Sequence, residues 1–224
     1  MHFSRLALSG LLAGAPLLVQ AQAAAAAAPR FYVGLAAYSS YYQPLGNQNF
    51  GGFQLPAQLT AGYQWRPRLA VQVGVAYSHF SNPYSYRGYY YPTPAGSEQR
   101  YYQRSGRATT SSTSVGVLGR YTLTKQPAHR LQFDLLGGFT LEHGRYRDRG
   151  TTTDSTQAGS FDNQHSTNSL LFSFGPSVRY RLGSAFELFT DYTFNVRLAT
   201  SEAYQPERVT TAGSLGLRYR FGAK

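Results

Sequence analysis

The sequence predicts an all-β protein: an eight-stranded antiparallel up-and-down transmembrane β-barrel with short periplasmic turns and long extracellular loops. Two observations carry this prediction. Apolar and polar side chains alternate through eight segments of about ten residues, the length that a tilted strand needs to cross the hydrocarbon core. The connections between these segments alternate between short and long. No segment shows a convincing helical period.

The first four segments are residues 31–41, 55–66, 69–79 and 111–123. Side chains alternate across a strand, so every second residue shares a face. In each segment one face is apolar and the other is small or polar, as a strand between lipid and a polar lumen requires. The residues predicted to face lipid are Phe31, Val33, Leu35 and Ala37; Leu59, Ala61, Tyr63 and Trp65; Val71, Val73, Val75 and Tyr77; and Val115, Val117, Tyr121 and Leu123.

The last four segments, 131–142, 169–182, 186–196 and 209–221, repeat this pattern with larger apolar side chains. The last one is the clearest, because one face ends in two aromatic residues and the opposite face ends in two arginines. The residues predicted to face lipid are Leu131, Phe133, Leu135, Phe139 and Leu141; Leu170, Phe172, Phe174, Val178 and Tyr180; Phe186, Leu188, Tyr192 and Phe194; and Leu215, Leu217, Tyr219 and Phe221.

The lengths of the connections give the orientation. Short periplasmic turns and long outer loops are the usual asymmetry of such barrels, and this places both termini on the periplasmic side. A soluble lipocalin also has eight strands, but its apolar residues face inward and its loops lack this alternation. The joins are short at 66–68, 124–130 and 182–185, and long at 40–54, 80–110, 143–168 and 197–208.

The N-terminal 23 residues have the pattern of a secretory signal peptide. A charged start with Arg5 precedes an apolar run over 6–19, and Ala21-Gln22-Ala23 is an A-x-A cleavage site. The alternative is an N-terminal membrane anchor, although the run is shorter than the ~20 residues of a membrane span. We therefore expect a signal peptide at 1–23, a short spacer at 24–30 and one barrel domain at 31–224.

The chain carries a formal net charge of +11 and no cysteine. The charge indicates an anionic partner, and a secretion signal argues against nucleic acid. Lipopolysaccharide phosphates outside the barrel, or acidic side chains inside it, are better candidates, and solubility alone is the simpler explanation. The absence of cysteine is compatible with an envelope protein that does not use disulfides.

Charged residues on the polar faces predict a network inside the lumen. An eight-stranded barrel is just wide enough to be filled by its own side chains, and charges in a low-dielectric interior must be paired. We expect Asp134 between the strands of Arg120 and Arg179, and Glu187 between those of Arg179 and Arg218. This predicts a plug without a pore; a selectivity filter in a small porin is the alternative. The predicted network is Arg120, Asp134, Arg179, Arg181, Glu187, Asp191, Arg218 and Arg220.

The connection 80–110 is rich in tyrosine and arginine, residue types enriched in recognition surfaces, and arginine forks suit phosphates. It predicts a surface-binding loop; a membrane-interface aromatic girdle or tyrosine-rich β-extensions above the membrane are the alternatives. The predicted binding residues are Tyr84, Tyr86, Arg87, Tyr89, Tyr90, Tyr91, Arg100, Tyr101, Tyr102, Arg104 and Arg107.

The element His79-Phe80-Ser81-Asn82 resembles the His-x-Ser-Asn element of the lipid A deacylase barrels of the outer membrane. The resemblance implies a histidine general base and a serine nucleophile on the lipid-facing rim. The family's element lies near the C-terminus and has an acidic residue on the next strand. Here it lies on the third strand, 111–114 holds no carboxylate, and Glu98 of the intervening loop is the substitute.

In architecture the whole chain after the spacer resembles the small OmpA/OmpX-type outer-membrane barrels. The aromatic end of segment 209–221 resembles their C-terminal signature, although three residues follow Phe221. The resemblance implies an integral protein of the Gram-negative outer membrane, contacting its lipids and lipopolysaccharide and assembled by the barrel-assembly machinery through its last strand. It also implies a non-enzymatic envelope-structural and surface-binding role, with possible surface ligands; no catalytic residue, metal site or cofactor is expected. A deacylase-like hydrolase using His79 and Ser81 is the alternative.

Overall fold

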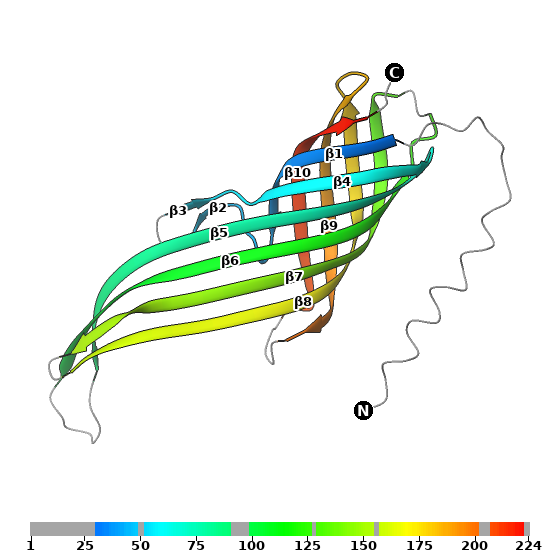
Figure 1. The fold of residues 1–224 in the computed structure, drawn as a ribbon. Helices are drawn as coiled ribbons and strands as arrows, with labels where there is room; N and C mark the ends of the chain where they lie inside the picture. The colour runs from blue at the N-terminus through cyan, green and yellow to red at the C-terminus, as the bar shows by residue number, and fades with distance from the viewer. Residues whose placement is uncertain are drawn as a thin grey trace, which may run out of the picture.

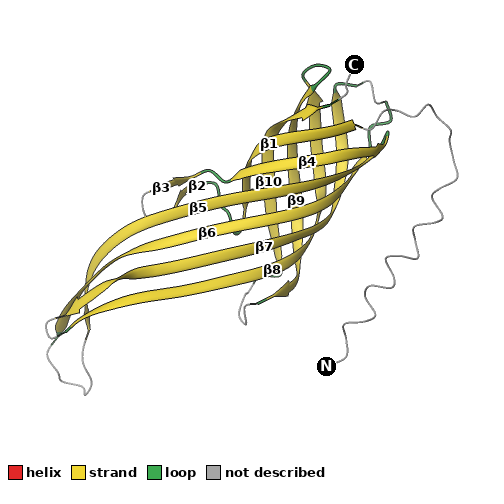
Figure 2. Cartoon of the chain, in the orientation of Figure 1, coloured by secondary structure: helices red, strands yellow, loops and turns green. Residues whose placement is uncertain are grey.

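A computed structural model describes residues 30–48, 52–90, 99–126, 129–154, 157–201 and 207–221. Its described part is built from β-strands joined by turns and loops (Figures 1 and 2). The predicted signal peptide and almost all of the spacer lie outside the described residues, so these two assignments stay predictions. The strands are β1 (Arg30–Ser40), β2 (Gly46–Gln48), β3 (Gly52–Gln54), β4 (Ala57–Arg66), β5 (Leu69–Tyr90), β6 (Arg100–Thr122), β7 (Leu131–Asp154), β8 (Ala158–Arg181), β9 (Phe186–Thr200) and β10 (Val209–Arg220).

Eight of these strands close into an antiparallel barrel in the order β1-β10-β9-β8-β7-β6-β5-β4. The first and last strands of the barrel complete the ring, because β1 pairs with β10 on one side and with β4 on the other. β2 and β3 form a small separate sheet. The predicted eight-stranded up-and-down barrel is confirmed. Within the described residues, no helix is long and apolar enough to cross a membrane.

Alternation places apolar side chains outside the barrel and polar ones inside. Along β5 from Ala70 to Ser78, each even-numbered residue is buried and each odd-numbered one is exposed. The lipid-facing set predicted from the sequence is exposed in the same way, with Leu35 and Leu59 each 63% exposed. A few apolar residues instead face inward, among them Leu136 and Phe189, each 1% exposed. The exposed apolar band is what a lipid-facing surface requires.

The four central strands are longer than predicted. The connections 80–110 and 143–168 are not mainly loops: β5 continues to Tyr90, β6 begins at Arg100, β7 continues to Asp154, and β8 begins at Ala158. The register of these strands runs without a shift from the barrel into this extension. The tyrosine-rich β-extension, considered as an alternative, is therefore the arrangement found. We call the parts of β5–β8 within 80–90, 100–110, 143–154 and 158–168 the exposed sheet (Figure 1).

The strand register places the chain ends at the end of the barrel opposite the exposed sheet. Arg30 of β1 pairs with Gln64, next to the short turn before β5, and Tyr32 pairs with Arg220 of β10. The short turn at residues 182–185 lies at the same end, since Tyr219 near the end of β10 pairs with Phe186. In a barrel of this kind the short-turn end is periplasmic, and the exposed sheet then projects outward.

Candidate functional site

Two arginines and two aspartates form the centre of the charged interior. Arg120 is 1% exposed and donates to Asp134 Oδ2 at 2.8 Å and to both carboxylate oxygens of Asp191 at 3.0 Å. It also donates to Ser177 Oγ at 2.6 Å. Arg179 donates two parallel hydrogen bonds to Asp134, from Nε to Oδ2 at 2.5 Å and from Nη2 to Oδ1 at 2.7 Å. Asp134 thus lies between Arg120 and Arg179, in a bidentate geometry that suits carboxylates.

Glu187 forms a second centre, nearer the periplasmic end. Its carboxylate lies 2.9 Å from Arg220 Nη1, 3.4 Å from Arg181 Nε and 3.5 Å from Arg179 Nη1. Arg179 therefore bridges the two centres, because it contacts both Glu187 and Asp134. Its remaining donor contacts are Thr122 Oγ1 and the Gln132 side-chain oxygen. A charge buried in a low-dielectric interior needs this number of partners.

Arg218 departs from the expected pairing. Its backbone lies opposite Glu187 in the β9–β10 register, yet no carboxylate among the described residues forms an ion pair with it. The guanidinium instead lies between two rings, 4.4 Å from the centroid of Tyr32 and 4.5 Å from that of Phe189. Its Nε and Nη1 are buried without a hydrogen-bond partner, and Nη2 reaches Gln72 at 3.5 Å. Cation–π contact replaces the predicted ion pair.

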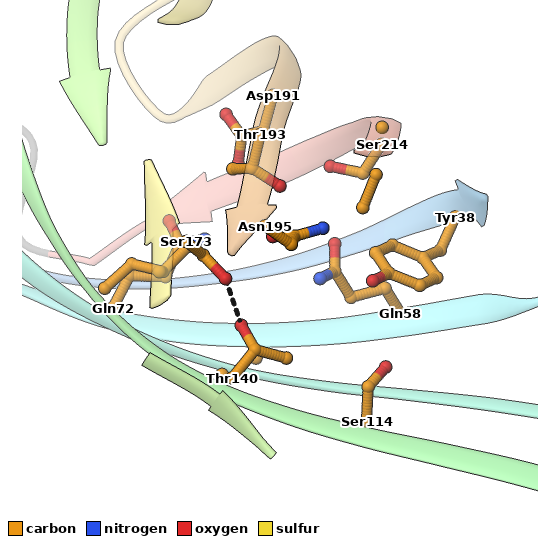
Figure 3. A pocket seen from close by; sticks show the side chains of 15 residues that line it. Tyr38, Gln58, Gln72, Ser114, Thr140, Ser173, Asp191, Thr193, Asn195 and Ser214 are labelled. Carbon is orange, nitrogen blue, oxygen red and sulfur yellow. Dashed lines mark hydrogen bonds between the residues drawn. The ribbon is translucent and has the colours of Figure 1, made fainter. Parts of the chain in front are cut away.

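Above the arginines the lumen holds a cavity of about 40 Å³ with mainly polar walls (Figure 3). The Thr140 and Ser173 hydroxyls lie 2.9 Å apart in its wall, and Asp191 also lines it (Figure 3). This volume suits a few waters, since one water needs roughly 10–15 Å³ measured in this way. The lumen at this level is a small cavity in an interior that side chains otherwise fill.

The exposed sheet has two different faces. Even-numbered residues of β5 continue the lumen face beyond Ser78, and odd-numbered ones continue the lipid face, because the register has no shift. The residues predicted as one binding loop are therefore divided. The lumen-side face has Tyr84, Tyr86, Tyr90, Arg100, Tyr102 and Arg104; the outer face has Arg87, Tyr89, Tyr101 and Arg107; Tyr91 lies outside the described residues.

The lumen-side face is held by internal contacts. Tyr84 donates to Asp148 Oδ1 at 2.7 Å, and Arg104 donates to Asp148 Oδ2 at 2.9 Å. The pKa of Tyr84 is raised, first by desolvation and then by this bond to Asp148. Arg104 also lies 4.0 Å above the ring of Phe161. Tyr86 and Tyr102 extend the cluster, with ring centroids 6.1 Å apart. Arg104 is thus engaged by the protein itself.

The outer face is strongly basic. Arg145, Arg147 and Arg149 lie on the same face of β7, because they alternate, and Arg149 lies directly opposite Arg107 of β6. We call Arg87, Arg107, Arg145, Arg147 and Arg149 the outer arginine face. Asp162 neutralises part of it: Arg147 Nε donates to Asp162 Oδ1 at 2.8 Å, and this bond lowers the pKa of the carboxyl. Arg145 donates to Gln164 at 3.0 Å.

Arg107 and Arg149 form no such hydrogen bond among the described residues, although Asp162 lies directly opposite Arg149 in the β7–β8 register. Together they line a wide, shallow hollow of about 580 Å³ that also includes Asp162, which is paired with Arg147. Like charges directly opposite each other on a sheet face are destabilising. A bound anion would relieve this repulsion.

The model for the family described as "Outer membrane protein beta-barrel domain" matches residues 10–221. The chain belongs to this family. It is an integral outer-membrane protein, as the closed barrel with its apolar outer band requires. No relative with curated annotation matches the chain.

Three solved outer-membrane proteins are similar to this chain. Ail of Yersinia pestis, in complex with the heparin analogue sucrose octasulfate, is 12% identical, with a TM-score of 0.46 over 86% of this chain and 97% of that one. A major outer membrane protein from Thermus thermophilus is 15% identical, with a TM-score of 0.44 over 87% and 100%. OprG from Pseudomonas aeruginosa is 10% identical, with a TM-score of 0.36 over 86% and 94%.

In this outer-membrane barrel His79 and Ser81 lie on the same, outer face of β5, at the start of the exposed sheet. The Ser81 hydroxyl lies 3.4 Å from Thr109 Oγ1, and the residue opposite His79 is Ser111. Glu98, the substitute acid, lies outside the described residues. The described geometry gives His79 no carboxylate partner of the kind that orients a general base. No cluster of three or more potential metal ligands occurs among the described residues.

The outer arginines of β7 and the ring of Phe189 are parts of these sites that were not predicted from the sequence. The outer arginines of β7 were assigned to a loop, although the run Arg145-x-Arg147-x-Arg149 has the period of a strand. Phe189 was omitted from the lumen, although alternation from Glu187 places it there. The pairing of Arg218 with two rings had no signal in the sequence, because Tyr32 is far away in the chain.

Proposed function

We propose that this protein is a non-enzymatic outer-membrane barrel with a structural role in the envelope, whose exposed sheet binds anionic groups at the cell surface. Phosphates of lipopolysaccharide and acidic groups of a surface polysaccharide share the required chemistry. The charged interior makes the barrel a plug, not an open porin. The last strand, with Tyr219 and Phe221 on its lipid face, is the segment that the barrel-assembly machinery recognises.

One observation supports the binding role most directly: Arg107 and Arg149 face each other across β6 and β7. Two guanidinium groups in this position can hold one phosphate or sulfate through charge-assisted hydrogen bonds. Most of the described tyrosines in the predicted binding loop, which included Arg107 but not Arg149, lie on the other face. We therefore assign anion binding to the outer arginine face and a structural role to the Tyr84–Arg104 cluster.

The experiment measures binding of lipopolysaccharide and of heparin to the purified protein in lipid nanodiscs. Replacing both Arg107 and Arg149 by Gln should weaken binding about tenfold or more, because each residue gives up a hydrogen bond to a charged group. The affinity of the wild-type protein should fall as salt is added, and the double variant should show a shallower salt dependence. Comparing the two anions distinguishes membrane-borne from soluble ligands.

The matched control removes the same amount of charge at the opposite end of the barrel. The variant with Lys125→Gln and Arg130→Gln has the same net charge as the double variant, and both positions are exposed near the periplasmic turn at 123–130. It should bind like the wild type. An equal loss of anion binding in both double variants would show that binding depends only on net charge, and the proposed site would be wrong.

The hydrolase alternative predicts a product, whereas the binding role predicts none. Mass spectra of lipid A from cells with and without the protein separate the two directly. We expect identical spectra. A species lacking one acyl chain, present only with the protein and lost in Ser81→Ala, would establish the enzyme.

A further inference from the structure

A second pocket lies where the barrel opens into the exposed sheet. Its volume is about 200 Å³, many times the roughly 10–15 Å³ that one water needs measured in the same way. Strands β6, β7 and β8 supply most of the wall, and Tyr42 from the segment after β1 supplies the rest. The pocket opens mainly on the lumen-side face, and Arg145 is the lining residue that it shares with the outer arginine face.

A buried carboxylate without a partner lines this pocket. Glu142 is 3% exposed, and its Oε2 has no hydrogen-bond partner. Its neighbours in the register, Ser114 and Ser169, carry no charge, and both hydroxyls bond elsewhere, to Gln43 and Thr200. A buried charge without a partner is costly. The contrast with Asp134, which accepts bonds from two arginines, makes Glu142 unusual in this lumen.

Ser112 adds a second unsatisfied group in the same wall. It is 3% exposed, and its hydroxyl is also buried without a hydrogen-bond partner. The serine and the carboxylate come from adjacent strands, since Ser112 pairs with Gly144 and Glu142 lies two residues before Gly144. Together they offer a ligand one charged acceptor and one hydroxyl that either donates or accepts.

The cations around the pocket are engaged with other residues. Arg197 donates to the Tyr42 hydroxyl; its positive charge acts on Glu142 from nearby, but no ion pair joins the two among the described contacts. Arg145, which also lines the pocket, donates to Gln164 at 3.0 Å, and His165 lies near Thr167 at 3.4 Å. Glu142 is therefore open to a cation that arrives from outside.

The aromatic wall indicates which cation fits. Tyr42 and Tyr146 both line the pocket, and tyrosine faces attract organic cations. We propose that this pocket binds a small alkylammonium group, with the ammonium on Glu142 and Ser112 and the alkyl chain against the tyrosines. The charge of the ligand is opposite to that of the ligand proposed for the outer arginine face, so the two sites can be tested independently.

The experiment titrates n-butylammonium into the folded protein in detergent micelles and follows binding by calorimetry. Butanol and butyrate have the same chain without the positive charge. The wild type should bind n-butylammonium saturably, and it should bind neither butanol nor butyrate. Glu142→Gln should weaken binding about tenfold or more, the usual effect of losing a hydrogen bond to a charged group. Ser112→Ala should give a smaller loss.

Asp154→Asn is the matched control, because it removes one carboxylate from the same strand at the far tip of the exposed sheet. It should bind n-butylammonium like the wild type. Glu142→Gln should also unfold at a higher temperature than the wild type, because it removes an unpaired buried charge. That rise confirms that the loss of binding does not come from misfolding.

Three results would overturn the proposal: no saturable binding to the wild type, equal binding to Glu142→Gln, or equal binding of butanol. Arg197→Gln gives a further test. A binding pocket predicts equal or tighter n-butylammonium binding in this variant, since a nearby positive charge is gone. If Glu142 instead pairs with Arg197 in solution, the variant loses stability, and the wild type shows no binding.

Discussion

In the lumen Asp134 accepts hydrogen bonds from both Arg120 and Arg179, whereas on the exposed sheet Arg107 and Arg149 oppose each other and form no ion pair among the described contacts. The two regions belong to the same strands and follow the same register. They differ in what surrounds the charges. In the lumen an unpaired charge has no water to solvate it, but on the outer face water and ions solvate it at little cost. Pairing inside therefore stabilises the fold, with Arg218 as an exception held between two rings, whereas unpaired arginines outside are available for binding.

The variant with the largest expected loss of stability is Glu187→Ala. Its carboxylate lies between Arg179, Arg181 and Arg220, so its removal takes a shared ion-pair partner from three neighbouring cations. Breaking a buried pair from one side costs roughly 3–5 kcal/mol. Urea unfolding in micelles should show a loss of this size, and Arg218→Ala should lose less. Equal losses would contradict the view that ion pairing holds the lumen together.

The second test compares two arginines that are equally buried. Arg120→Met leaves Asp191 without its ion-pair partner and Asp134 with one fewer, and should cost about 3 kcal/mol or more. Arg218→Met keeps an elongated side chain between Tyr32 and Phe189 and removes two unsatisfied nitrogens. It should be neutral or stabilising, as replacements of poorly paired buried charges often are. A large loss in both variants would mean that Arg218 has a partner the geometry does not reveal.

A smaller effect is expected on the lumen-side face of the exposed sheet. Arg104→Met removes one bond to Asp148 but keeps a side chain over Phe161. We expect a local loss of about 1 kcal/mol, seen as faster cleavage of the exposed sheet by protease. The heat-dependent gel shift of the barrel should not change. A change in that shift would show that the sheet and barrel unfold as one unit.

The smallest effect on stability is expected where the binding effect is largest. Arg107→Gln alone removes the like-charge pair, keeps Arg149 opposite Asp162, and should be more stable than the wild type by roughly 0.2–1 kcal/mol at low salt. Added salt should erase this gain, because the charges are exposed. A loss of stability would show that Arg107 supports the sheet. Its role would then be structural, and anion binding would need another explanation.

The barrel could be predicted from the sequence because lipid and lumen impose opposite demands on successive residues. Val71, Val73 and Val75 alternate with Gln72 and Gly74, and the structure exposes and buries them accordingly. The membrane supplies this signal, so it ends where the membrane ends.

Above the membrane both faces of a strand meet water, and alternation of hydropathy is lost. Tyr84 and Arg87, for example, have a similar polar character although they lie on opposite faces of the exposed sheet. The sequence therefore indicated a rich surface but not how the strands divide it. Likewise, parity alone places Glu142 on the lumen face, but only three-dimensional packing reveals that its Oε2 has no hydrogen-bond partner.

The unshifted ladder of β6, β7 and β8 has a mechanical consequence. The backbone hydrogen bonds continue from the membrane into the exposed sheet, with no bulge in the β6–β7 or β7–β8 register. From Leu141 to the end of β7 the strand extends for ~44 Å at 3.4 Å per residue. A pull on the tip is carried along these strands into the barrel wall, because no flexible joint interrupts them. The exposed sheet would therefore act as a rigid spacer that holds an attached surface at a fixed distance from the membrane.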